Sequence, residues 1–343
     1  MMGTATFRTT DGVEYVVSCE EETTLLAAAE QAGYLLVSSC HHGACGTCRA
    51  QVAQGTVRLA EHSPHALPPE DEADGGVLLC CGHPEGDVVI DLPYDSSRVG
   101  SGSIPVRKVR IETIENWPGE VVRLVVRAEE DPELGSAIQF ESGQYAELTP
   151  PGGGAPRAFS FASVANWDGT AEFYIKLHEN GYFSGYLRTT ATVGDELILR
   201  GPQGSFGLHE NGSRPRWMVC GGTGLAPCMS MLRRMAEWGE TQEARLILGV
   251  NTPGEVFATA EMAELRTMLP TLRTVVTVAQ PDQTWTGPVG TAVDALDAEL
   301  GARTPGTEVP DIYLSGPPAF LEAAVARAAA HGIPGDQIYE ERI

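Results

Sequence analysis

Three cysteines stand within nine positions near the start of the chain, and this cluster constrains the fold more than any other feature. The stretch "SSCHHGACGTC" contains Cys40, Cys45 and Cys48 in a C-x4-C-x2-C spacing. A fourth cysteine, Cys80, follows 32 positions after Cys48, directly behind the apolar run "GVLL". Clustered cysteines in a reducing compartment are typical of metal ligands or redox groups. We therefore expect the first part of the chain to fold so that a strand end returns to this loop.

The spacing of the cysteines predicts a [2Fe–2S] cluster. In such sites three ligands come from a C-x4-C-x2-C loop and the fourth comes from far downstream, which is the position of Cys80. Gly43 and Gly46 lie in the same loop. They would let backbone N–H groups bend toward the sulfur atoms, and such hydrogen bonds help to set a cluster's potential.

Two other sites would use some of the same residues. A zinc ion could bind the C-x2-C pair together with Cys80 and Cys81, or with His41 or His42. Zinc sites usually combine two separate short pairs, however, and Cys80 and Cys81 are adjacent. A thioredoxin-like dithiol would leave Cys40 and Cys80 unexplained. We expect both histidines to be solvent-facing loop residues near a partner surface, and Cys81 to be a spare thiol or a substitute for Cys80.

Charge and hydropathy limit the partners of the chain. The formal net charge is −23, which argues against nucleic acid because its phosphates would be repelled. Residues 1–97 hold three Arg, no Lys and fifteen Asp or Glu, so their formal charge is −12. Such asymmetry is typical of a docking face for a basic partner, although a generic acidic surface gives the same pattern. With neither a secretory signal nor an apolar run of roughly 18–20 residues, we expect a cytoplasmic protein with no membrane partner.

Two polar breaks divide the 343 residues. The first, "YDSSRVGSGSIP" (94–105), reads as a Ser/Gly linker, and the second is "ENGSRPR" (210–216). Short strands and a Thr-capped helix are predicted before the first break, strands between the breaks, and alternating strands and helices after the second. These patterns predict domains at 1–97, 103–212 and 214–343, the second an antiparallel barrel and the third a parallel α/β sheet.

A flavin could bind where "RAFSFAS" is followed by "HENGYFSGYL". Arg157 can neutralise a phosphate, Phe159 can lie against a ring, and Ser160 can hydrogen-bond a flavin edge. Gly181 and Ser184, at the start of a predicted helix, offer backbone amides to a pyrophosphate. A strand end and a polar turn explain the same residues without any cofactor, and the residues alone favour that simpler interpretation.

A nucleotide site is predicted at "VCGGTGLAPCMSML" (219–232), which reads as a strand, a glycine-rich turn and a helix. In that geometry the N-terminus of the helix receives a dinucleotide pyrophosphate. A second strand-to-helix turn, "YLSGPPAF" (313–320), is expected at the same edge of the sheet. No Lys or Arg occurs between Leu246 and Arg266, where a 2′-phosphate would need a cation. NADH is therefore preferred over NADPH.

The three motifs in this order resemble the ferredoxin–NADP⁺ reductase superfamily with an N-terminal plant-type [2Fe–2S] domain. The stretches "HALPPEDEADGGVLLC", "VDALDAEL" and "GIPGDQIYEE" look like the reductase components of soluble diiron monooxygenases, such as the methane monooxygenase reductase. The resemblance implies a β-grasp-like α+β ferredoxin domain, an antiparallel β-barrel FAD domain and a parallel-sheet NAD domain.

The resemblance also implies roles for individual residues. It assigns the [2Fe–2S] cluster to Cys40, Cys45, Cys48 and Cys80, FAD to Arg157, Phe159, Ser160, Gly181 and Ser184, and NADH to Gly221, Gly222, Gly224, Ala226, Pro227, Gly316 and Pro317. Cys228 and Ser315 are candidates for the nicotinamide side, and no acid–base residue is expected because the cofactors carry the chemistry. The chain departs from the family at Phe159, where Tyr is usual, at Ser315, where Cys is usual, and at Ile343, where an aromatic residue is common.

The expected activity is that of an NADH-dependent reductase. Electrons would pass from NADH to FAD, then singly through the [2Fe–2S] cluster to the diiron hydroxylase of a soluble hydrocarbon monooxygenase. The reductase of a Rieske ring-hydroxylating dioxygenase is the nearest alternative. A redox sensor without turnover and a structural zinc protein are alternatives of different classes.

Overall fold

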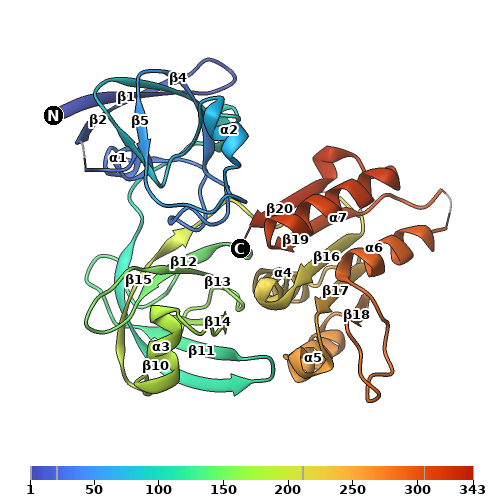
Figure 1. Cartoon of the computed structure of the whole chain (residues 1–343). Coiled ribbons are helices and arrows are strands. Elements are labelled where there is room, and N and C mark those ends of the chain that lie inside the picture. The colour runs from blue at the N-terminus through green and yellow to red at the C-terminus, as the bar shows by residue number, and fades with distance from the viewer. Residues whose placement is uncertain (1, 21, 211, 305, 343) are drawn as a thin grey trace. The chain divides into compact units, whose positions relative to one another are not determined.

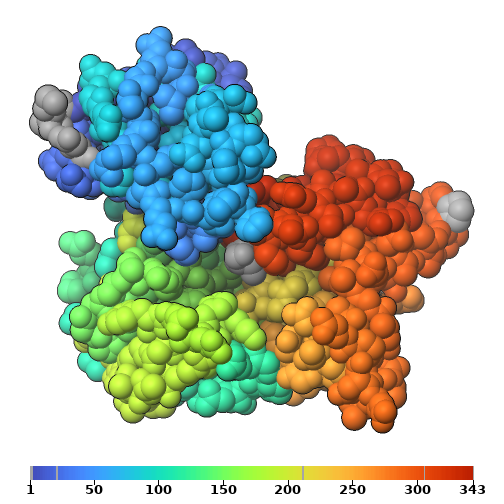
Figure 2. All heavy atoms as spheres, in the orientation of Figure 1, coloured from blue at the N-terminus to red at the C-terminus, as the bar shows by residue number. Residues whose placement is uncertain are grey.

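The computed structural model describes residues 2–20, 22–210, 212–304 and 306–342. They form two compact units: one comprises residues up to Pro105 together with Gln203–Ser205 and Arg342, and the other comprises Val106–Pro202 and Phe206–Glu341. Figure 1 shows the elements, and Figure 2 shows the atoms coloured along the chain from blue at the N-terminus to red at the C-terminus. Among the described residues, no helix has the length and apolar character needed to cross a membrane.

The first unit is built on a mixed five-stranded sheet in the order β2-β1-β8-β4-β6. Its strands are β1 (Met2–Arg8), β2 (Glu14–Glu20), β4 (Arg49–Gln54), β6 (Gly76–Leu78) and β8 (Val88–Asp91). β1 pairs antiparallel with β2 and parallel with β8. Helix α1 (Leu25–Gln31) buries its apolar residues in the same core, and the Thr24 side chain accepts a hydrogen bond from the backbone N–H of Ala27. The predicted Thr cap is therefore confirmed.

Short elements that the sequence did not predict complete this unit. They are β3 (Tyr34–Leu35), β5 (Val57–Leu59), α2 (Pro69–Ala73), β7 (Gly82–Pro84), η1 (Ser96–Arg98) and β9 (Gly100–Ser101). β5 pairs with β7, and β3 pairs with β9. The predicted linker 94–105 ends where the two units divide, but η1 and β9 lie within it, so part of the stretch belongs to the first unit's structure. Only residues 102–105 separate β9 from the next strand.

The second unit begins with a six-stranded antiparallel sheet in the order β13-β12-β15-β10-β11-β14. Its strands are β10 (Val106–Trp117), β11 (Val121–Ala128), β12 (Tyr145–Thr149), β13 (Arg157–Ser160), β14 (Thr170–Lys176) and β15 (Glu196–Gln203). An antiparallel bridge between Phe161 and Phe173 joins the β13 end of the sheet to β14. The sheet thus closes on itself, and the predicted antiparallel barrel is confirmed. Helix α3 (Tyr182–Thr189) buries Phe183 and Leu187 in the barrel core.

The rest of the second unit is an α/β sheet in the order β18-β17-β16-β19-β20. Its elements are β16 (Arg216–Gly221), η2 (Gly222–Gly224), α4 (Leu225–Glu237), β17 (Ala244–Val250), η3 (Pro253–Glu255), α5 (Thr259–Met268), β18 (Leu272–Val278), α6 (Ala292–Gly301), β19 (Asp311–Gly316), α7 (Pro318–Ala330), η4 (Gly335–Gln337) and β20 (Ile338–Arg342). β16 pairs parallel with β17 and β19, and β17 pairs parallel with β18, as predicted. Along β16, Met218 packs in the core that contains α4 and α5, whereas Val219 packs in the core that contains α6 and α7.

The barrel and the α/β sheet share one hydrophobic core. Tyr174 of β14 is buried in the same cluster as the apolar residues of α4 and α5. The ring of Trp117, at the end of β10, lies 5.1 Å from Tyr174 and 5.9 Å from Phe257, measured between ring centroids. The two halves of the second unit are therefore joined by continuous apolar contact.

Candidate cofactor sites

The four predicted cluster ligands come together in the first unit. Cys40, Cys45 and Cys48 lie on the loop between β3 and β4, and Cys80 follows β6. The sulfur atoms of Cys48 and Cys80 are 3.3 Å apart, and both residues are buried. Cys45 is also buried, whereas Cys40 is partly exposed. The fold therefore brings a distant strand end back to the loop, as the spacing predicts.

Backbone N–H groups point at the sulfur atoms of this loop. The amides of Ala44 and Cys45 donate to the Cys40 sulfur at 3.3 and 3.4 Å. The amide of Thr47 donates to the Cys45 sulfur at 3.5 Å. The loop can take this shape because Gly43 and Gly46 adopt φ angles of 74° and 79°, which favour glycine.

The chemistry of these side chains fits an iron–sulfur cluster. Hydrogen bonds from Cys45 and then from Cys80 lower the pKa of the Cys40 thiol, and the hydrogen bonds to Cys40 raise the pKa of Cys45 and of Cys80. A thiol with a low pKa is present as the thiolate, which is the form that binds metal. Four cysteines, backbone donors aimed at sulfur and a mostly buried setting together match the requirements of a [2Fe–2S] site.

The prediction for the neighbouring histidines is half right. His42 is exposed. The side chain of His41 is only 14% exposed: its Nδ1 lies 4.0 Å from a carboxylate oxygen of Glu30, and its Nε2 lies 3.2 Å from the Ser38 hydroxyl. The expectation that His41 faces solvent is therefore wrong, because its ring lies beside Glu30 of α1 and Ser38. The sulfur of Cys81 lies 3.6 Å from that of Cys80, so it stays within the same group of thiols.

The predicted flavin residues occupy β13 and the start of α3. β13 carries Arg157, Phe159 and Ser160, with Ser160 buried. The Phe159 ring lies 5.0 Å from the ring of Phe183, which is on α3. This contact brings the strand and the helix together. Arg157 donates to the backbone carbonyl of Pro156 at 3.0 Å.

The N-terminus of α3 is compact and has no side-chain cap. Gly181 is its N-cap residue and makes no side-chain capping hydrogen bond. The Ser184 hydroxyl accepts from the backbone N–H of His178 at 3.0 Å and lies where a Cβ on Gly181 would meet it at 2.9 Å. A helix start that lacks a capping side chain suits the phosphates of a dinucleotide such as FAD.

The predicted nucleotide residues lie at one edge of the α/β sheet. Gly221 ends β16, and Gly222 and Gly224 form η2 ahead of α4. A Cβ at Gly221 or Gly222 would meet no atom within 4 Å, so the turn opens onto free space. Ala226 and Pro227 stand in the buried first turn of α4, which has no capping side chain.

The second glycine turn lies beside the first. β16 and β19 run parallel with Cys220 opposite Ser315, so their ends reach the same edge. Gly316 ends β19, and Pro317 is the N-cap residue of α7. Two helix N-termini at one edge of a parallel sheet are suited to a dinucleotide, and these residues fit NADH.

Three further residues were singled out in the sequence: Cys228, Ser315 and Ile343. Cys228 is wholly buried in the core between α4 and the sheet. Ser315 is also wholly buried, and its hydroxyl has no hydrogen-bond partner among the described residues. A role for either one beside the nicotinamide stays a prediction. Ile343 lies outside the described residues.

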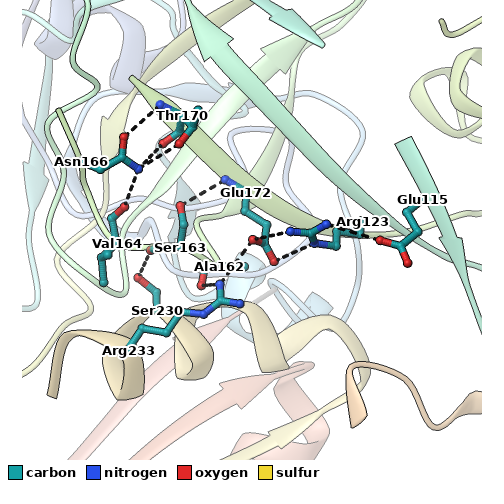
Figure 3. A network of polar contacts seen from close by, with 10 residues as sticks. All are labelled: Glu115, Arg123, Ala162, Ser163, Val164, Asn166, Thr170, Glu172, Ser230 and Arg233. Atoms are coloured by element: carbon teal, nitrogen blue, oxygen red, sulfur yellow. Dashed lines mark hydrogen bonds and ion pairs between the residues drawn. The ribbon is translucent and has the colours of Figure 1, made fainter. Parts of the chain in front are cut away.

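A buried ion network that the sequence did not predict joins strands β11 and β14 of the barrel to α4 (Figure 3). Glu172 of β14 pairs with Arg123 of β11 and Arg233 of α4. Burial raises the pKa of Glu172, but the attraction of the two arginines outweighs it and holds that pKa below its ordinary value. Glu172 is therefore a carboxylate at neutral pH, held between two guanidinium groups.

Comparison with known families matches all three parts of the chain. Residues 8–85 match a 2Fe-2S iron-sulfur cluster binding domain, residues 119–207 an oxidoreductase FAD-binding domain, and residues 218–326 an oxidoreductase NAD-binding domain. These matches agree with the fold and with the three kinds of site described above.

Relatives that match most of the chain are components of monooxygenases and dioxygenases. The chain is 37% identical to methane monooxygenase component C of Methylosinus trichosporium, covering 77% of this chain and 78% of that protein. It is 31% identical to the propane 2-monooxygenase reductase component of Rhodococcus jostii, covering 96% and 89%. It is also 31% identical to the toluate 1,2-dioxygenase electron transfer component of Pseudomonas putida, covering 97% and 96%.

A solved structure has the same fold over nearly the whole chain. An Amycolatopsis cytochrome P450 reductase matches with a TM-score of 0.78 and 27% identity, covering 99% of this chain and 98% of that one. Three cofactor-domain matches, a common fold and relatives that share over 30% identity lead to one conclusion. The chain belongs to the family of NAD(H)-dependent iron–sulfur flavoprotein oxidoreductases that includes the reductase components of multicomponent monooxygenases.

Proposed function

We propose that this protein oxidises NADH and delivers the electrons one at a time to the diiron hydroxylase of a soluble hydrocarbon monooxygenase. The observation that carries the proposal is the presence, on one chain, of a dinucleotide-binding edge, a flavin-binding barrel and a four-cysteine loop. When bound, FAD and the [2Fe–2S] cluster supply the conversion of a hydride's electron pair into single electrons.

The residues of the chain supply binding and placement for this reaction. Backbone amides at the starts of α3 and α4 would hold the phosphates of the two dinucleotides. The buried cysteine loop would exclude water from the cluster and stabilise charge on its sulfurs through the amides of Ala44, Cys45 and Thr47. No side-chain acid or base is required.

NADH is the proposed donor because the end of β17 carries negative charge. The carboxylate of Glu255 accepts a hydrogen bond from the backbone N–H of Asn251, directly after β17. No Lys or Arg occurs between Leu246 and Arg266. A carboxylate near this strand end disfavours the extra phosphate of NADPH.

The proposed acceptor rests on the relatives and on charge. The similarity of the chain to methane and propane monooxygenase components supports a diiron hydroxylase as the electron acceptor. The formal charge of −12 over residues 1–97 would steer a basic partner face and raise association by roughly 10–10³-fold at low salt. The similarity to the toluate dioxygenase component favours a second candidate, the reductase of a Rieske dioxygenase.

Two experiments test the proposal. The first is steady-state reduction of ferricyanide and cytochrome c by NADH; absence of turnover would support a redox sensor instead. The second compares the rates at which the NADH-reduced protein reduces a purified diiron hydroxylase and a purified Rieske dioxygenase under anaerobic conditions. Faster reduction of the Rieske protein would replace the leading candidate by the second. A colourless preparation that contains zinc and no iron would exclude the cluster.

A further inference from the structure

Helix α4 links the predicted nucleotide site to the predicted flavin site. Its N-terminus follows the glycine turn η2, and within the next two turns or so it presents Ser230 and then Arg233 to the barrel. These residues are three positions apart and therefore lie on one face of the helix. Arg233 is about 12 Å along the helix from its first residue, at 1.5 Å per residue.

Both side chains hold the backbone that follows the flavin-binding strand. The Ser230 hydroxyl donates to the carbonyl oxygen of Ser163 at 2.5 Å. Arg233 Nη1 donates to the carbonyl oxygen of Ala162 at 2.7 Å. Ala162 stands two positions after Ser160, the last residue of β13. Helix α4 is thus hydrogen-bonded to the backbone directly after the strand that carries Arg157, Phe159 and Ser160.

The same guanidinium also pairs with Glu172. Arg233 Nη1 lies 3.5 Å from Glu172 Oε2, and the two side chains are only 22% and 10% exposed. Glu172 is also hydrogen-bonded to the segment that α4 contacts. Its carbonyl oxygen accepts from the N–H of Ala162 at 2.7 Å, and its N–H donates to the Ser163 hydroxyl at 3.2 Å. Arg123 holds the carboxylate from the other side at 3.2 Å.

We propose that Ser230 and Arg233 are positioning residues, which set the flavin-binding strand relative to the nucleotide-binding turn so that a hydride can transfer. We call this pair the α4 clamp. The inference rests on the part of the proposed function in which NADH reduces a bound FAD. Hydride transfer depends steeply on geometry, since a misplacement of about 1 Å can cost roughly 100-fold in rate. Binding of FAD alone or of NADH alone does not depend on how the barrel is positioned against the α/β sheet.

The test uses the full-length, FAD-loaded protein and four variants. Arg233→Met removes the guanidinium, Arg233→Lys keeps its charge, and Ser230→Ala removes one hydroxyl. Arg234→Met is the matched control, because the neighbouring Arg234 pairs with Glu237 on its own helix and contacts Trp238. FAD content, the dissociation constant for NADH, and the rate of flavin bleaching in a single turnover at saturating NADH are measured.

For Arg233→Met, we expect the bleaching rate to fall about 10- to 100-fold, while FAD content and NADH affinity change less than about twofold. Arg233→Lys should recover part of the rate, because one ammonium can reach the positions that Nη1 occupies. Arg234→Met should behave like the wild type. An Arg233→Met rate within twofold of the wild type, an equal loss in Arg234→Met, or no recovery in Arg233→Lys would overturn the proposal.

A second readout does not depend on turnover. Hydrogen–deuterium exchange of residues 157–163 in the FAD-free protein should be faster in Arg233→Met and Ser230→Ala than in the wild type and Arg234→Met. Unchanged exchange in both clamp variants would also overturn the proposal.

If Arg233→Met does not retain FAD, Ser230→Ala supplies the kinetic result, and a Ser230→Ala bleaching rate equal to that of the wild type counts against the clamp. If NADH does not bleach the flavin of the wild type, the proposed function fails, and the exchange experiment still tests the clamp.

Discussion

The sulfur atoms of Cys48 and Cys80 lie 3.3 Å apart although 32 positions separate the two residues. The loop before β4 and the strand end after β6 meet because β4 and β6 pair in antiparallel register, with Arg49 opposite Leu78. The cluster site is thus a product of sheet pairing as much as of the cysteine spacing.

Cys80, and not its neighbour Cys81, is predicted to be the fourth ligand. Cys80→Ser should remove most of the bound iron and the visible absorption of the purified protein, because one of four thiolates is lost. Cys81→Ser should retain about two irons per chain, the content of one [2Fe–2S] cluster. Iron analysis and the absorption spectrum decide between them, and equal iron loss in both variants would show that Cys81 also serves as a ligand.

Gly46 is predicted to be required for the cysteine loop. A Cβ at this position would lie 2.7 Å from the carbonyl oxygen of Ala66, and φ is +79°. Gly86→Ala is a matched control, because φ there is +91° and a Cβ would meet no atom within 4 Å. We expect a loss of about 1–2 kcal/mol in the free energy of unfolding for the control, because a Cβ is disfavoured at positive φ. Gly46→Ala should lose about 1–3 kcal/mol more, because backbone must move. Denaturant unfolding of the first unit measures both, and equal losses would contradict the clash.

Glu172 is predicted to stabilise the second unit in a pH-dependent way. Glu172→Gln should lower the free energy of unfolding by about 3–5 kcal/mol at pH 7, because Arg123 and Arg233 lose their buried partner. The folded-state pKa of Glu172 lies below its ordinary value of 4.5. The carboxylate therefore contributes fully above about pH 4.5, and its contribution falls as the pH drops through the folded-state pKa. The free energies of unfolding of the wild type and Glu172→Gln should converge as the pH is lowered from 7 to 3. A difference that stays constant over this range would contradict the charge effect.

Glu255 is predicted to discriminate against NADPH. Replacing it by Gln should raise kcat/KM for NADPH about tenfold, equivalent to about 1.4 kcal/mol, because a repelling carboxylate near the end of β17 is neutralised. Activity with NADH should change much less. Glu264→Gln, an exposed acid on α5, changes the net charge equally and should leave the ratio of the two activities as in the wild type. A shift of the same size in both variants would assign the effect to overall charge.

The parts that could be predicted from the sequence are those with strong local signals. Cys40, Cys45 and Cys48 follow a ligand spacing, Thr24 precedes an apolar helix, and the glycines after β16 mark a strand-to-helix turn. Each depends on residues a few positions apart. The antiparallel barrel and the parallel α/β sheet followed from the spacing of strands, turns and helices, whereas the order of strands within each sheet did not.

The parts that could not be predicted depend on contacts distant in sequence. β9 is formed by Gly100 and Ser101, which have no apolar periodicity and become a strand only through pairing with β3. Arg233 and Ala162 are 71 positions apart, and nothing in the local pattern distinguishes Arg233 from Arg234. His41 was predicted to be an exposed polar residue, whereas its ring lies beside Glu30, eleven positions earlier, and Ser38.

The hydrophobic core that Trp117, Tyr174 and Phe257 join has a consequence for protein engineering. A chain divided after Pro105 keeps each core intact, since each of the two compact units has its own core. A chain divided between β15 and β16 would expose apolar surface on both fragments, and we expect those fragments to aggregate. Fusion proteins that exchange one redox module for another should therefore place the junction between Pro105 and Val106.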